Sequence, residues 1–330
     1  MIPHSIPLFD HDHGDHLVVG TSNSSNVSQL DAPLDIFFDN KGNLYVADTG
    51  NNRILKYIQN MTDTILINEH SSLYPKLKRP TALFVDEYEN IYVTDSQGED
   101  NVPIRLYYRV LMYWPLSKDK YEVAELFTGS DSQCNDIYLD SDFNIYTAEM
   151  YNNRVMKWFA PYYNHSIILV DGNILGWGAY SDYFTPRSIY IDYNTNDLYI
   201  LHYYPGFIDY KVFENYKNRI IVWSNNTQKN ITLISEPVDP RIMAGDCNGN
   251  LYVLDIGIFR ISAYQSISSV AKSSSVPVEF LYVYSYPFDV YSISSIALNP
   301  RNGNLYIINK RYNNIIKYTI SCYFQRIPVV

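Results

Sequence analysis

The chain has 330 residues, of which 46% are hydrophobic and 18% are charged, and its formal charge at neutral pH is −10. This composition excludes an intrinsically disordered chain, and the lack of a long unbroken apolar run excludes a helical membrane span. The net negative charge repels phosphate backbones, so nucleic acid is not an expected partner. With 33 tyrosines beside 14 phenylalanines, the composition favours half-buried β-sheet.

The chain starts with a polar leader, residues 1–15, which is predicted to be disordered. Residues 10–16 read DHDHGDH, a composition that also suits metal binding, although a defined site would need a folded partner. Since no signal-peptide pattern begins the chain, the protein is expected to be cytoplasmic, or extracellular if a signal peptide precedes it. Glycosylation sequons favour the second alternative and begin at Asn23, Asn26, Asn60, Asn164, Asn225 and Asn230.

After the leader, one sequence phrase occurs six times. Its clearest copies are PLDIFFDNKGNLYVADTGNNRILKY from Pro33 and CNDIYLDSDFNIYTAEMYNNRVMKW from Cys134. A tyrosine in the middle of each copy recurs at intervals of 47, 54, 53, 53 and 54 residues, so units of similar length fill the chain. These marker residues are Tyr45, Tyr92, Tyr146, Tyr199, Tyr252 and Tyr306.

Each unit is predicted to form a four-stranded antiparallel sheet. Three short apolar runs are separated by turns rich in Gly, Asn and Asp, and a fourth run follows before the next copy. The sixth unit lacks the fourth run, and residues 16–20, HLVVG, are predicted to supply it from the other end of the chain. The sequence therefore predicts an all-β, six-bladed β-propeller of four-stranded blades over residues 16–320, closed by its N-terminal strand and followed by a short C-terminal tail, 321–330.

The repeated phrase resembles the NHL repeat in its P-x-x-I start, its central G-N-L-Y-V-A-D and its N-N-R-I-x-K-Y end. The resemblance covers residues 16 to 318, is best in the first and third units, and is interrupted by insertions in the second and fourth. It implies a propeller fold. It selects no single function, because NHL propellers include RNA-binding and protein-binding domains of ring-finger ligases, extracellular modules and the peptidyl-hydroxyglycine lyase domain of peptide amidation.

One residue in each unit ends the second predicted strand, and these residues are expected on a common rim. Five of them are candidate ligands for a divalent cation, and the sixth is Asn309. The candidates are Asp48, Asp95, Glu149, His202 and Asp255. A structural explanation is favoured, in which an acidic residue pairs across its own turn with an arginine five residues later. These turn pairs are Asp48 with Arg53, Glu149 with Arg154, and Asp255 with Arg260. No cofactor is expected.

Two connections after this rim position are longer than five residues: 14 residues from Asp95 to Arg109 and 17 from His202 to Arg219. Loops on a rigid scaffold often bind partners, and these loops are rich in aromatic residues. Folding of the insertions onto themselves is the alternative. His202 breaks the acidic pattern and is the best single candidate for function. The candidate ligand-binding residues are His202, Tyr203, Tyr204, Phe207, Arg105, Tyr107 and Tyr108.

The sequence as a whole predicts a non-catalytic binding module that recognises a protein partner or another ligand through this rim. One alternative is a metal-dependent lyase or hydrolase at the channel mouth, similar to the peptidyl-hydroxyglycine lyase. Another is the substrate-recognition domain of a ring-finger ubiquitin ligase. Cys134 replaces a proline at the start of its unit and is predicted to be buried, whereas a disulfide between Cys247 and Cys322 is left open.

Overall fold

The computed structural model describes residues 29–58, 64–67, 76–96, 107–117, 120–129, 132–175, 184–203, 219–224, 229–234, 239–246, 250–256, 260–264, 279–282 and 292–318. The predicted leader, residues 1–15, the predicted closing strand, 16–20, and the tail, 321–330, lie outside these residues. The described part of the chain contains no helix long and apolar enough to span a membrane.

The described strands form six antiparallel sheets, five with four strands and one with three. Sheet 1 comprises β1 (Asp35–Phe38), β2 (Leu44–Asp48), β3 (Arg53–Tyr57) and β4 (Thr64–Ile67), with the 3-10 helix η1 (Thr49–Asn51) between β2 and β3; sheet 2 comprises β5 (Pro80–Val85), β6 (Ile91–Ser96), β7 (Tyr108–Ser117) and β8 (Lys120–Gly129); sheet 3 comprises β9 (Cys134–Leu139), β10 (Ile145–Glu149), β11 (Arg154–Trp158) and β12 (Ser166–Asp171). Sheet 4 comprises β13 (Thr185–Asp192), β14 (Asp197–Tyr203), β15 (Arg219–Ser224) and β16 (Lys229–Ile234); sheet 5 comprises β17 (Pro240–Gly245), β18 (Leu251–Asp255), β19 (Arg260–Tyr264) and β20 (Glu279–Tyr282); sheet 6 comprises β21 (Ile293–Leu298), β22 (Leu305–Asn309) and β23 (Asn314–Tyr318).

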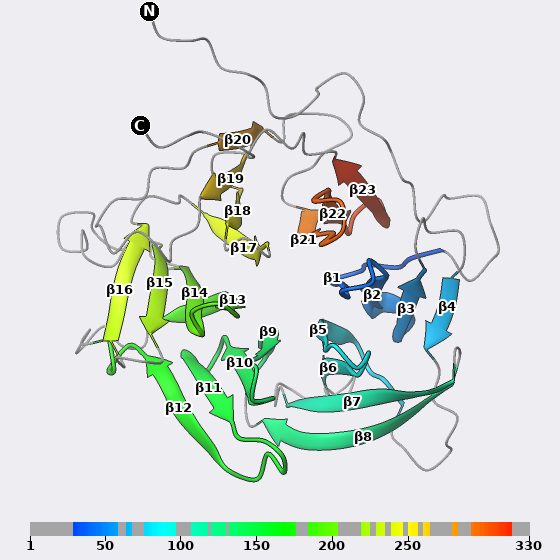
Figure 1. Cartoon of the computed structure of the whole chain (residues 1–330), viewed down its shortest axis with the longest axis horizontal. Helices are drawn as coiled ribbons and strands as arrows, with labels where there is room; N and C mark the ends of the chain where they lie inside the picture. Colours follow the sequence, from blue (N-terminus) through cyan, green and yellow to red (C-terminus); the bar gives the residue numbers. More distant parts are fainter. Residues whose placement is uncertain are drawn as a thin grey trace, which may run out of the picture.

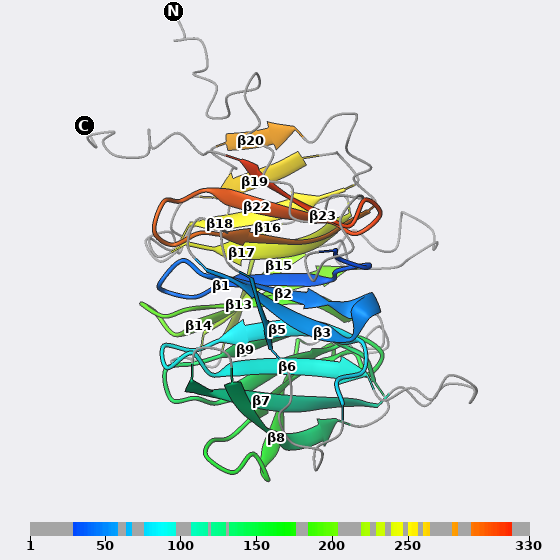
Figure 2. The same ribbon diagram turned by 90° about the vertical axis from the view of Figure 1, so that its right-hand side faces the viewer.

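The six sheets are arranged radially, and the first strand of each sheet lies nearest the centre (Figure 1). We call β1, β5, β9, β13, β17 and β21 the inner strands. In the view turned by 90°, the strands run across the molecule between two faces (Figure 2). On the entry face the inner strands begin and each second strand turns into the third; on the exit face the inner strands end. The all-β, propeller-like fold that the repeats predict is confirmed.

Each sheet buries both of its faces against its neighbours. The described hydrophobic core divides into clusters, each at a junction between two adjacent sheets. At the junction of sheets 6 and 1, Ile36 and Leu44 pack with Tyr306 and Ile315. Burial on both faces explains why a second strand such as β2, LYVAD, is buried at every residue and has no alternation of apolar and polar residues.

In sheets 1 to 5 an aspartate organises the first turn, between the first and second strands. In sheet 1, Asp39 Oδ1 accepts hydrogen bonds from the backbone N–H groups of Lys41 and Asn43, at 2.9 and 2.8 Å. Its Oδ2 accepts from Asn43 Nδ2 at 2.7 Å and from the Tyr45 hydroxyl at 3.2 Å. Sheets 2 and 3 repeat these contacts around their own aspartates. The D-x-x-x-N-x-Y spacing is thus explained by one carboxylate that binds the turn, the Asn and the marker Tyr.

Each inner strand has one unpaired edge, which faces the centre. Side chains of the preceding sheet bind backbone groups near the start of this edge. In four units the second residue of the repeat reaches a carbonyl group at or just before the start of the next inner strand, so a backbone acceptor on an open edge gains a donor. The donor and acceptor residues are Thr81 and Cys134, Asn135 and Pro186, Arg187 and Pro240, and Ser294 and Pro33.

The last of these contacts joins the final sheet to the first. Ser294 Oγ donates to the carbonyl oxygen of Pro33 at 2.8 Å. Beside it, the backbone N–H of Ala32 donates to Asn313 Oδ1, also at 2.8 Å. Sheets 6 and 1 are therefore joined by the same type of bond as sheets 2 and 3, sheets 3 and 4, and sheets 4 and 5, together with a shared hydrophobic cluster.

Candidate functional site

Six side chains lie at the last or next-to-last residue of the second strands on the entry face, and all are at most 2% exposed. Each lies opposite the first residue of the third strand or, in sheet 2, the second residue, whatever the length of the connection. His202 faces Arg219 in the same register in which Asp48 faces Arg53. The six are Asp48, Asp95, Glu149, His202, Asp255 and Asn309.

In sheets 1 and 3 the facing residues form ion pairs. Arg53 Nε lies 2.6 Å from Asp48 Oδ2, and Arg154 Nε lies 2.6 Å from Glu149 Oε2. The other oxygen of Asp48, Oδ1, accepts the backbone N–H of Asp31 at 2.7 Å. One carboxylate therefore holds both its own turn and the segment that leads into the sheet.

In sheet 5, Asp255 Oδ1 accepts the N–H of Asp239 at 2.9 Å, and its backbone faces that of Arg260. The side chain of Arg260 is not among those that the structure describes. All five residues considered as metal ligands are described, and in the described ranges no three His, Cys, Asp or Glu side chains form a group that could hold a metal ion. The structure instead places these carboxylates in turn hydrogen bonds.

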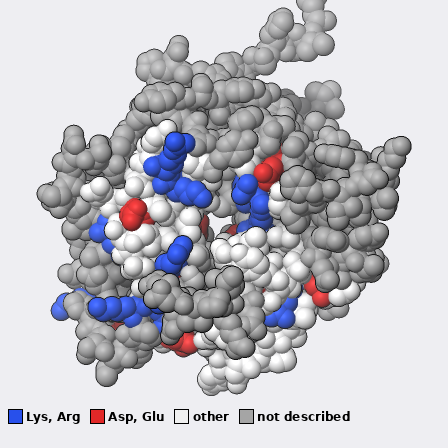
Figure 3. All heavy atoms as spheres, turned by 180° about the vertical axis from the view of Figure 1, so that it is seen from behind, with Lys and Arg blue, Asp and Glu red and all other residues white. Residues whose placement is uncertain are grey.

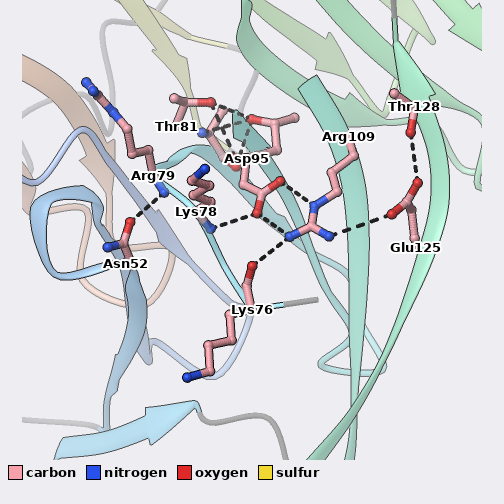
Figure 4. A network of polar contacts seen from close by, with 11 residues as sticks. Asn52, Lys76, Lys78, Arg79, Thr81, Asp95, Arg109, Glu125 and Thr128 are labelled. Carbon is pink, nitrogen blue, oxygen red and sulfur yellow. Dashed lines mark hydrogen bonds and ion pairs between the residues drawn. The ribbon is translucent and has the colours of Figure 1, made fainter. Parts of the chain in front are cut away.

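Sheet 2 has an ion pair that the sequence spacing did not indicate (Figure 4). Arg109 Nε lies 2.6 Å from Asp95 Oδ1, and Arg109 Nη2 lies 2.7 Å from Asp95 Oδ2. Both side chains are buried, at 1% and 0% exposure. Arg109 Nη2 also donates to the carbonyl oxygen of Lys76, and Asp95 Oδ2 accepts the N–H of Lys78. The long connection between β6 and β7 leaves this bidentate pair intact because strand register, not loop length, sets it.

His202 occupies the position of the acidic residues and performs the same structural task. Its Nδ1 accepts the backbone N–H of Thr185 at 3.1 Å, and its ring stacks on that of Phe184 at 5.4 Å. The side chain is 0% exposed. His202 is therefore not displayed at the rim, as the hypothesis of a ligand-binding histidine required, because its acceptor nitrogen holds the segment that enters sheet 4.

We expect His202→Asn to be more stable than His202→Ala by about 1–3 kcal/mol, the cost of leaving the buried Thr185 N–H without an acceptor. Asparagine already fills the matching position in sheet 6, where Asn309 Oδ1 accepts from Ser292 Oγ at 2.6 Å. Urea unfolding of the two variants measures the difference. Equal stability would show that the acceptor is not what His202 contributes.

The aromatic candidates of the two long connections differ in their surroundings. Tyr108 is 1% exposed, and its hydroxyl donates to Glu149 Oε1 at 2.6 Å, so it joins sheets 2 and 3 and is not an exposed anchor. Tyr107 is half-buried. Tyr203 is half-buried, with the guanidinium of Arg187 3.5 Å from its ring centroid. Arg105, Tyr204 and Phe207 lie outside the described residues.

The entry face carries exposed basic residues near the starts of the inner strands and the turns between second and third strands. Figure 3 shows this face, with Lys and Arg side chains standing on several sides of the central opening. Arg187 and Arg241 share the carboxylate of Asp239, at 3.1 and 3.3 Å. The exposed basic residues of this face are Lys76, Arg79, Arg241, Lys310 and Arg311.

Between the inner strands lies a cavity of about 420 Å³. It is lined by residues of all six inner strands and by turns of the exit face, including Asn40, Asn194 and Pro300. The cavity lies within the size range of small-molecule sites, about 300–1,000 Å³. It is therefore a second candidate site, separate from the basic residues of the entry face.

Two half-buried aspartates in this cavity bind the open edges of inner strands. Leu83 N–H donates to Asp35 Oδ2 at 2.8 Å, and Ile189 N–H donates to Asp136 Oδ2 at 2.9 Å. Ser295 Oγ donates to Asp35 Oδ1 at 2.7 Å, which links sheet 6 to sheet 1. Each aspartate therefore joins its own inner strand to the next one.

The surroundings of these aspartates favour their protonated forms. Burial raises the pKa of Asp35 to about 6, although the hydrogen bonds from Leu83 and Ser295 oppose the shift. Burial also raises the pKa of Asp136 to about 8, and the negative charge of Asp35 adds to the effect. The pair thus holds protons at a pH where aspartate is ordinarily ionised.

The sequence hypotheses named neither Asp35 nor Asp136. The available signal was the third residue of the repeat, which is aspartate in PLDIFF and CNDIYL but alanine, serine or isoleucine in the other units. Cys134 is buried as predicted, and burial raises its thiol pKa well above the usual value. Cys247 and Cys322 lie outside the described residues.

Comparisons with known proteins agree with the repeat and the fold. The family model of the NHL repeat matches residues 30–57, the first unit. None of the curated protein sequences matches the chain. A catalytically inactive virginiamycin B lyase from Staphylococcus aureus with quinupristin aligns at a TM-score of 0.56 and 11% identity, over 91% of this chain and 83% of its own.

Two other solved structures are similar at the same level. A glucose dehydrogenase aligns at a TM-score of 0.58 and 10% identity, over 88% of this chain and 97% of its own. The hydrazine synthase of Kuenenia stuttgartiensis aligns at a TM-score of 0.54 and 12% identity, over 90% of this chain and 98% of its own. Such low identities bear on the fold alone. The chain carries an NHL repeat at residues 30–57 and has an all-β, β-propeller-like fold.

Proposed function

We propose that residues 16–320 form a six-bladed propeller, with residues 16–20 as the fourth strand of sheet 6, and that it is a non-catalytic binding module for a protein partner. Its binding surface is the entry face. The observation that carries the proposal is the group of exposed Lys and Arg side chains around the central opening of that face (Figure 3).

The entry face has the rigidity that a recognition surface needs. Buried pairs such as Asp95 with Arg109 hold the ends of the second and third strands together. The two long connections, residues 97–107 and 204–218, leave from and return to these strand ends. Loops anchored on a rigid scaffold at both ends are common binding elements.

The charge distribution favours an acidic partner surface. The whole chain has a formal charge of −10 and so repels an acidic protein overall, and the exposed Lys and Arg side chains of the entry face give such a partner a local site of attraction. Such complementarity fixes the orientation of a complex and raises its association rate.

The test is a charge reversal on the entry face, Arg79→Glu with Arg241→Glu and Arg311→Glu. We expect this triple variant to bind a fluorescent 20-residue poly-glutamate peptide about tenfold more weakly or worse in an anisotropy titration, because each removed contact is worth a fraction of the binding free energy. Binding by the unmodified protein should also weaken between 50 and 200 mM salt.

Arg301→Glu is the matched control, because Arg301 is exposed in the turn between β21 and β22 on the exit face. It should leave poly-glutamate binding unchanged. Equal loss in the control would contradict a role for the entry face. Tighter binding of an oligouridylate than of poly-glutamate would replace the acidic protein by nucleic acid as the partner.

A further inference from the structure

The charged side chains that line the central cavity are all acidic among the described residues. Its lining includes four aspartates, and among the described residues that line it there is no lysine, arginine or histidine. Asp35 and Asp136 belong to the inner strands, whereas Asp192 and Asp246 lie at the exit face, where β13 ends and directly after β17. The basic residues of the entry face lie outside this lining. A positively charged group is thus favoured within the cavity and has access from the exit face.

Asp35 and Asp136 each retain capacity for one more donor. An ionised carboxylate offers about four acceptor positions. Asp35 accepts from Leu83, Ser295 and Ile36. Asp136 accepts likewise from two backbone N–H groups and one serine hydroxyl, at 2.8–2.9 Å. The remaining position on each aspartate is available to a donor from a ligand.

Aromatic rings form part of the lining of the cavity. Tyr138 stands 5.5 Å from Tyr190 and 6.1 Å from Tyr193, measured between ring centroids, and Phe37 also lines the cavity. Sheets 5 and 6 contribute smaller residues to the lining, Ala244, Gly245 and Ala297, and Gly245 lies directly against the ring of Tyr190. The aromatic rings supply flat surfaces for the ring of a ligand and negative faces for a cation.

We propose that this cavity binds an organic cation, a primary ammonium group attached to an aromatic or other flat apolar body. The ammonium donates to Asp136, and the apolar body lies against Tyr138 and Tyr190. The ligand enters from the exit face. This inference goes beyond the proposed function, because it concerns a different ligand and a different surface from the entry face.

The experiment is isothermal titration of the full chain at pH 7 with benzylammonium, and with benzyl alcohol as its uncharged isostere. We expect benzylammonium to bind at least tenfold more tightly. Because the folded protein holds a proton on Asp136, with its pKa at about 8, binding of the cation should release protons. The apparent enthalpy should therefore change when a buffer of low ionisation enthalpy, phosphate, is replaced by one of high ionisation enthalpy, Tris. This readout needs no variant.

Asp136→Asn should lose at least tenfold in benzylammonium affinity and most of the proton release. The matched control is Asp142→Asn, in the first turn of the same sheet, because Asp142 is exposed and does not line the cavity. The inference would be overturned if the two probes bound with equal affinity or if neither bound. It would also be overturned if Asp136→Asn bound benzylammonium with unchanged affinity. None of these outcomes bears on poly-glutamate binding at the entry face.

Discussion

Replacement of Arg109 by methionine is expected to lower the free energy of unfolding by about 3–5 kcal/mol, because it leaves a buried carboxylate without its partner. Asp95 is 0% exposed and receives two of its hydrogen bonds from Arg109 (Figure 4). Methionine preserves much of the length of the side chain, so the loss reports on the charge more than on packing. Urea unfolding followed by tryptophan fluorescence measures it.

Arg53→Met is the matched control. Arg53 pairs with Asp48 at the same repeat position and the same 2.6 Å distance, but it is 19% exposed where Arg109 is 1% exposed. Water reaches this pair, so a smaller loss is expected. Adding Asp95→Asn to Arg109→Met should recover part of the stability, because the unpaired charge is removed. A loss below about 1 kcal/mol in Arg109→Met would mean that Asp95 finds another partner or takes up a proton.

The second large effect concerns pH. The pKa of Asp136 rises from 3.8 to about 8 on folding, and that of Asp35 rises to about 6. Between about pH 4 and pH 8 the folded chain therefore binds more protons than the unfolded chain. The stability that Asp136 contributes is present below pH 4 and is lost as the pH rises toward 8, with a slope of at most about 1.4 kcal/mol per pH unit for one proton.

Asp136→Asn removes this titration, so its stability relative to the unmodified protein should improve steadily from pH 5 to pH 8. Urea unfolding at four pH values in this range gives the difference curve. Asp142→Asn, a replacement at an exposed position of the same sheet, is the matched control. A difference curve that is flat, or that slopes the other way, would mean that Asp136 is already ionised in the folded chain at pH 5.

The sequence predicted those features that repeat within a unit. The first-turn aspartate, its Asn and the marker Tyr recur at fixed spacing because one carboxylate binds all of them. The same local regularity predicted the strands and the all-β fold. Contacts of this kind can be predicted from the sequence because both partners lie within a few residues of each other.

Contacts between units were not predictable in the same way. Asp35 binds Leu83, 48 residues later, and Tyr108 binds Glu149, 41 residues later. Such partners depend on how adjacent sheets are stacked, and no spacing in the sequence encodes that. His202 shows a related point, because its chemistry differs from that of Asp48, but its position imposes the same task of accepting the N–H of the entering segment.

The bond between Ser294 and Pro33 has a consequence for how the protein forms. Its two residues are 261 positions apart, and the neighbouring contact of Ala32 with Asn313 spans 281. Joining ends that far apart adds little to the equilibrium cost, because the closure entropy grows only with the logarithm of the loop length. It does slow folding, since contacts of such long range become available only after most of the chain has been synthesised and collapsed. Until then, the facing apolar surfaces of sheets 6 and 1 lack their partners on the growing chain, and exposed apolar surface of this kind favours aggregation.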